Sequence, residues 1–95
     1  MNISELMIEL MDTQAFAEAY YRLEPHKQLA MAVIRARIQN GWSQQQLSVR
    51  SGVARNTISA IEHMAANPTL ETMQNLAKAL GLKLTLTLEV ELEPI

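Results

Sequence analysis

The sequence contains no cysteine and little glycine, proline or aromatic character, with three glycines, three prolines, one tryptophan, two tyrosines and one phenylalanine in 95 residues. The absence of cysteine excludes disulfides, thiolate metal sites and a cysteine nucleophile. There is no glycine-rich phosphate loop and no serine elbow, and His26 and His63 lack the spacing of metal ligands. These absences argue against an enzyme and predict neither a metal nor a cofactor site.

Long hydrophobic runs and an N-terminal basic cluster are also missing. No apolar stretch approaches the roughly 18 residues that a membrane-spanning helix needs. Glu5, Glu9 and Asp12 stand where a secretory signal would carry Lys or Arg. We therefore expect a cytoplasmic protein without a membrane partner. A length of 95 residues indicates one domain with an extension, and so small a core favours self-association.

The formal net charge of -2 hides an uneven distribution. Residues 1–24 carry five acidic side chains and one arginine, whereas residues 25–83 carry seven lysines and arginines against two glutamates. Residues 84–95 carry three glutamates and no basic residue. A basic middle suits a polyanionic partner, and the acidic ends suit a different role.

Residues 1–24 are predicted to form a helical extension. Apolar side chains recur there at helical spacing in two stripes, and Thr13 can cap the second helix. The stripes consist of Ile3, Leu6, Met7, Leu10 and Met11, and of Phe16, Tyr20 and Leu23. These side chains either pack on the core or face a protein partner, and methionine suits both roles because its flexible side chain adapts to irregular surfaces.

Residues 25–83 contain the start and stop signals of four helices, at about 25–40, 43–51, 55–64 and 69–80. The signals are Pro25, Gly41, the capping box of Ser43 and Gln46, Gly52, Asn67, Pro68, Thr69 and Gly81. Apolar spacing predicts that the first of these helices buries some of Leu29, Val33, Ile34 and Ile38. It predicts that the last has Leu70, Met73, Leu76, Ala77 and Leu80 inside.

The C-terminal segment changes to a period of two. Apolar residues alternate with Thr and Glu over Leu84, Leu86, Leu88, Val90 and Leu92. This alternation predicts a half-buried β-strand. No second strand is predicted elsewhere, so we expect the strand to pair with its copy in a homodimer, because unpaired strand backbone is unfavourable. A frayed tail, or pairing with another protein, is the alternative.

The run of residues 41–62, followed by residues 67–71 and 76–81, resembles the Cro/C1-type (Xre) helix-turn-helix family over about residues 29–83. The matching features are a Ser-Gln opening, a leucine three residues on, a Gly-Val turn, Ile-Ser-Ala-Ile-Glu in the second helix and Asn-Pro-Thr-Leu-Glu after it. The resemblance implies a mainly α, lambda-repressor-like fold of five or six helices. We divide the chain into the extension 1–24, the DNA-binding domain 25–83 and the dimerisation strand and tail 84–95.

The two short helices provide the expected DNA-reading surface. Leu47, Val53, Ile58 and Ile61 are the apolar positions that lock them together, and Gly52 makes the turn. The exposed residues at the start of the second helix then face the major groove.

Arg55 can pair with guanine and Asn56 with adenine. Gln44, at the start of the preceding helix, is placed to contact a phosphate. The family resemblance adds Thr57 and Asn67 as phosphate contacts. The full set of expected DNA-binding residues is Gln44, Arg55, Asn56, Thr57, Ser59, Ala60 and Asn67. The alternative for each is a solvated surface position, and Arg50 could equally be solvated or bound to phosphate.

Other features follow from the family pattern. Arg37 and Glu62 match the positions of an arginine–glutamate pair, so we expect a structural ion pair, and Trp42 is expected at the core or its rim. Ala54 replaces the usual Ser or Thr cap, and residues 63–66 lack the basic side chains common there. We therefore expect modest affinity per subunit, offset by dimeric binding to two half-sites about one helical turn apart.

The layout outside residues 29–83 resembles HigA-type antitoxins of type II toxin–antitoxin systems, and the tail resembles the dimerising tail of HipB-type antitoxins. This resemblance implies a repressor of its own operon that also neutralises a RelE/HigB-like ribonuclease toxin. Met7, Met11, Phe16 and Tyr20 are the expected toxin-binding residues. The alternatives are a free-standing Xre-type regulator without a toxin, or a protein-binding adaptor that has lost DNA affinity.

Overall fold

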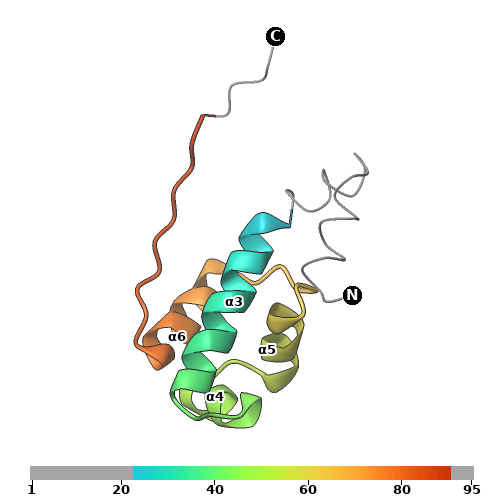
Figure 1. The fold of residues 1–95 in the computed structure, drawn as a ribbon, viewed down its shortest axis with the longest axis vertical. Helices are drawn as coiled ribbons and strands as arrows, with labels where there is room; N and C mark the ends of the chain where they lie inside the picture. Colours follow the sequence, from blue (N-terminus) through green and yellow to red (C-terminus); the bar gives the residue numbers. More distant parts are fainter. Residues whose placement is uncertain (1–22, 91–95) are drawn as a thin grey trace, which may run out of the picture.

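The computed structural model describes residues 23–90, which contain four helices (Figure 1): α3 (Glu24–Gln39), α4 (Gln44–Ser51), α5 (Arg55–Glu62) and α6 (Leu70–Leu80). The mainly α fold is confirmed. The additional helices of the expected five or six were assigned to residues 1–22, which lie outside the described residues. The expected toxin-binding residues and Leu92 of the tail also lie outside this range.

The four helices form one bundle around a shared core. α3 packs against α5 and α6, and α4 packs against the same two helices. In Figure 1, α3 runs down the middle with α6 on one side and α5 on the other, and α4 crosses below. The two shortest helices, α4 and α5, thus lie next to each other at one end of the bundle.

Local hydrogen bonds explain where α4 and α6 begin. Ser43 and Gln46 form the predicted capping box, in which the Gln46 backbone N–H donates to Ser43 Oγ at 3.1 Å and the Ser43 N–H donates to Gln46 Oε1 at 2.7 Å. Thr69 caps α6 by accepting from the Thr72 N–H at 3.1 Å. Gly52, with a φ of 74°, ends α4 in the left-handed conformation that glycine adopts at no steric cost.

The core consists of small and branched apolar side chains. Its buried members are Val33, Ala36, Leu47, Val53, Ile58, Ile61, Leu76 and Leu80, and Leu29, Trp42, Ala66 and Ala79 pack against them. The four residues expected to lock α4 to α5 are all buried, and Trp42 lies at the rim of the core, as predicted.

One expected core position, Leu70, is wrong, and Ile38, one of the four candidate positions of α3, is left out of the core. Ile38 is 62% exposed and Leu70 is 54% exposed, whereas the small Ala30 and Ala36 are buried in α3. Apolar periodicity identifies which face of a helix is buried, but not how far along the helix its neighbours extend.

The predicted β-strand is not formed within residues 23–90. Residues 82–90 have no regular secondary structure and run away from the end of α6 (Figure 1). Leu88 and Val90 are about nine-tenths exposed, at 91% and 90%. The physical reason is that a strand needs a ladder partner, and no described segment supplies one.

Candidate nucleic-acid interface

The connection between α4 and α5 is a tight turn held by side-chain hydrogen bonds. Ser48 Oγ donates to the Val53 carbonyl at 2.6 Å, and the Val53 N–H donates to Ser51 Oγ at 3.1 Å. Gly52 supplies the left-handed conformation between these bonds, and Val53 is buried beside them. The turn therefore holds α5 in one orientation relative to α4.

The start of α5 presents two unengaged polar side chains to solvent. Arg55 and Asn56 are exposed, and neither makes a hydrogen bond or an ion pair within residues 23–90. Ala54, the N-cap residue, forms no side-chain cap bond, as its replacement of Ser or Thr predicts. Thr57, Ser59 and Ala60 are half-buried and lie further along the helix. The exposed donors of this helix are thus concentrated at its first turn.

Arg37 and Glu62 form the expected ion pair, in bidentate geometry. Arg37 Nε donates to Glu62 Oε2 at 2.8 Å, and Nη2 donates to Oε1 at 2.9 Å. The third guanidinium nitrogen, Nη1, donates to the Trp42 carbonyl at 2.9 Å. The hydrogen bond to Glu62 raises the pKa of Arg37 above its ordinary value, against the opposing effect of burial. The pair joins α3 to the last residue of α5.

Gln44 is part of the same network, which the sequence did not indicate. Its Nε2 donates to Glu62 Oε1 at 3.2 Å, and the side chain is half-buried at the first position of α4. The Gln44 side chain, which we expect to contact a phosphate, is therefore already held by the Glu62 carboxylate. No local pattern signals this bond, because its partners are 18 residues apart.

Arg50 does not extend freely into solvent. Its guanidinium lies over the Trp42 ring, 4.4 Å from the ring centroid. A cation–π contact of this kind contributes about 0.5–1 kcal/mol at an exposed site. In this contact the Arg50 side chain points along α4 toward the N-terminal end of the helix, which is the usual direction of side chains in a helix.

Asn67 lies in the loop between α5 and α6 and is held by the first turn of α3. His26 Nε2 is 2.6 Å from Asn67 Oδ1, and Nε2 carries the proton of this bond because an amide oxygen only accepts. The other ring nitrogen of His26, Nδ1, is buried and finds no hydrogen-bond partner among residues 23–90. This contact across 41 residues fixes the loop relative to α3.

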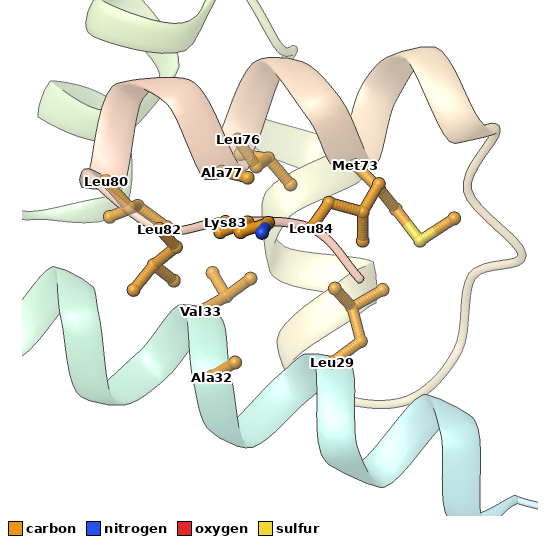
Figure 2. Close-up of a pocket in the computed structure, with 10 residues that line it drawn as sticks. All are labelled: Leu29, Ala32, Val33, Met73, Leu76, Ala77, Leu80, Leu82, Lys83 and Leu84. Carbon is orange, nitrogen blue, oxygen red and sulfur yellow. The ribbon is translucent and has the colours of Figure 1, made fainter. Parts of the chain in front are cut away.

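A second surface feature is an apolar groove between α3 and α6 (Figure 2). The chain that leaves α6 crosses between the two helices, so that the groove has walls from three segments. Its lining residues are Leu29, Ala32, Val33, Met73, Leu76, Ala77, Leu80, Leu82, Lys83 and Leu84. The groove adjoins the exposed apolar residues of the tail, because Leu82 lines the groove and is itself 43% exposed.

The described part of the chain offers neither a membrane-spanning helix nor a metal cluster. None of its helices is both long and apolar enough to cross a membrane. Residues 23–90 also hold no cluster of three His, Asp or Glu side chains that could ligate a metal ion.

Comparison with known proteins agrees with this geometry. The sequence model of the helix-turn-helix family matches residues 33–86 of this chain. Two curated relatives are the antitoxin HipB of Escherichia coli strain K12, 35% identical over 68 residues, and that of Escherichia coli O6:H1, 34% identical over 68 residues. The matches cover 72% of this chain in both cases, and 77% and 72% of the relatives. No solved structure matches at a significant level. The chain belongs to the helix-turn-helix family of DNA-binding proteins.

Proposed function

We propose that this protein is a sequence-specific transcriptional repressor that acts as the antitoxin of a type II toxin–antitoxin module and represses its own operon. The observation that carries the DNA-binding part is the first turn of α5. Arg55 and Asn56 are exposed and unengaged there, on a helix whose orientation is set by the Gly52 turn. An arginine and an asparagine in this position suit guanine and adenine in the major groove.

The remaining contacts divide by position. Gln44 at the start of α4 and Asn67 in the following loop suit phosphates, which fix the register of the protein on DNA. Thr57 is a third phosphate contact, and Ser59 and Ala60, half-buried on the same helix, make the shorter contacts to base edges.

The antitoxin assignment is supported by the two HipB antitoxins that this chain resembles. Their name favours a HipB-type over a HigA-type antitoxin, and with it a toxin partner other than a RelE/HigB-like ribonuclease. The acidic residues 1–24 remain our proposal for the toxin-binding segment, through Met7, Met11, Phe16 and Tyr20.

The working form is a homodimer joined through residues 84–92. Leu86, Leu88 and Val90 are exposed at 59%, 91% and 90%, an apolar stripe that water disfavours. Pairing two tails antiparallel would satisfy their backbone groups, and the paired apolar face could cover the adjoining groove between α3 and α6 (Figure 2). A dimer would place two α5 helices on two half-sites.

The test is a gel-shift titration of the full chain on the DNA upstream of its own gene. We expect a shift that weakens steeply as salt rises, because phosphate binding releases counterions. The control is the double variant Arg55→Ala and Asn56→Ala, whose side chains make no hydrogen bond or ion pair within residues 23–90. Absence of any shift at low salt would leave a protein-binding adaptor as the function.

Co-expression with the adjacent gene tests the antitoxin part. The expected result is that the neighbouring protein arrests growth alone and that this chain restores growth and co-purifies with it. An adjacent gene that is not toxic, together with a positive gel shift, would identify a free-standing regulator.

A further inference from the structure

The carboxylate of Glu62 connects three helices at the start of α4. Glu62 is the last residue of α5, its side chain is only 5% exposed, and Arg37 of α3 holds both of its oxygens. One of these oxygens, Oε1, also accepts from Gln44 Nε2 at 3.2 Å. The position of the Gln44 amide is thus set by a carboxylate that cannot move without breaking the bidentate pair.

The charge of Glu62 also sets the direction of the Gln44 amide. An ionised carboxylate only accepts hydrogen bonds, so only the nitrogen of the amide can face it. The flipped amide would bring two oxygens together inside a part-buried site. A glutamine at position 62 would remove this constraint, because its own amide can both donate and accept.

The amide nitrogen of Gln44 has a second hydrogen that no residue of the described fold accepts. The backbone N–H groups of Gln44 and Gln45 open the same helix and have no intrahelical partner, whereas the Gln46 N–H is already bonded to Ser43. The unused side-chain N–H and the free backbone N–H groups thus belong to the same first turn of α4, and all of these donors suit an oxyanion.

From this geometry we propose that Glu62, held by Arg37, is a positioning residue for DNA binding that keeps a side-chain N–H of Gln44 directed at a backbone phosphate. The proposal rests on the proposed DNA-binding function. It gives the ion pair a role at the interface, beyond joining α3 to α5, and it gives that role to a residue that does not touch the DNA.

The experiment is a double-mutant cycle on DNA affinity with the full chain and its upstream duplex. Gln44→Met keeps the length of the side chain and removes its donors, and Glu62→Gln removes the charge. Each single variant should weaken binding about five- to tenfold, on specific and unrelated duplexes alike, since a phosphate contact carries no sequence information. The DNA affinity of the double variant should be no lower than that of the single variant with the larger loss.

Gln45→Met is the matched control for this cycle, because Gln45 is an exposed neighbour on α4 without a bond to Glu62. Its effect should multiply with that of Glu62→Gln. The proposal would be overturned if the losses of affinity from Gln44→Met and Glu62→Gln multiply in the double variant, or if Glu62→Gln binds DNA as tightly as the wild type. In either case, DNA binding by the wild type would still support the proposed function. If the wild type fails to shift DNA, the proposed function itself fails.

Circular dichroism at the assay temperature distinguishes a variant that has lost DNA affinity from one that has unfolded. If Glu62→Gln is not fully folded at that temperature, Arg37→Lys replaces it in the cycle. Lysine keeps the charge but cannot form the bidentate hydrogen bonds to both carboxylate oxygens. The same lack of additivity with Gln44→Met is expected, and full additivity would again overturn the proposal.

Discussion

Arg37 and Glu62 lie 25 residues apart in the sequence and meet through two hydrogen bonds of 2.8 and 2.9 Å. Their side chains are 17% and 5% exposed, so the pair is largely withdrawn from water. Removal of one partner would leave the other charge buried without compensation, which costs far more than the pair contributes.

The first prediction concerns this asymmetry. Glu62→Ala and Arg37→Met should each lower the free energy of unfolding by about 3 kcal/mol, a large part of the stability of a small domain. The double variant Arg37→Met with Glu62→Leu should recover most of that loss. Urea unfolding followed by circular dichroism measures all three. A double variant as unstable as the sum of the singles would contradict this account.

The second prediction concerns the missing cap of α5. Ala54 has a φ of -57° and a ψ of 140°, outside the helical region as an N-cap residue requires, and it is exposed. Ala54→Ser should therefore stabilise the fold by about 1 kcal/mol by accepting from an unpaired N–H of the first turn. Thermal unfolding is the measurement. Ala65→Ser, at an exposed alanine that begins no helix, is the control and should change little.

The third prediction separates base reading from phosphate binding. Arg55→Ala should relax the preference at one base pair of the operator by about 1–3 kcal/mol, because that side chain reads a base edge. Binding to a panel of operators with single base changes measures this. Arg35→Ala removes the same charge from an exposed position of α3 and should leave the preference order unchanged. A uniform loss for Arg55→Ala would reassign it to phosphate.

The fourth prediction concerns the tail. The double variant Leu86→Asp and Leu88→Asp places charges on the apolar stripe and should convert a dimer to a monomer. Thr85→Asp with Thr87→Asp adds the same charge to the alternating polar positions and should leave the dimer intact, since neighbouring strand residues point to opposite faces. Sedimentation equilibrium distinguishes the two. Equal effects of both pairs would show that the stripe does not form the interface.

The fifth prediction concerns the turn between α4 and α5. A Cβ at Gly52 would meet no atom within 4 Å, so the cost of a side chain there comes from the φ of 74° alone. Gly52→Ala should lower the unfolding free energy by about 1–2 kcal/mol, and Gly52→Asn by less, because asparagine tolerates the left-handed region. Chemical denaturation compares them. A larger loss for asparagine than for alanine would point to steric exclusion instead.

Much of this architecture could be predicted from the sequence because it depends on local chemistry. The Ser43–Gln46 capping box, the Thr69 cap and the glycine at position 52 each act over a few residues, and each is found in the structure. The family resemblance supplied the Arg37–Glu62 pair, which residue spacing alone does not indicate. The absence of a side-chain cap at Ala54 could also be predicted from the residue type.

Only the tertiary structure decided the contacts between distant segments. The exposure of Ile38 and Leu70, the bond from Gln44 to Glu62 and the contact of His26 with Asn67 all depend on which helices meet and where. Helix periodicity specifies a face, and caps specify ends, but neither determines the partner of a side chain 18 or 41 residues away. That choice is made by packing, because only the assembled core brings those atoms within hydrogen-bond distance.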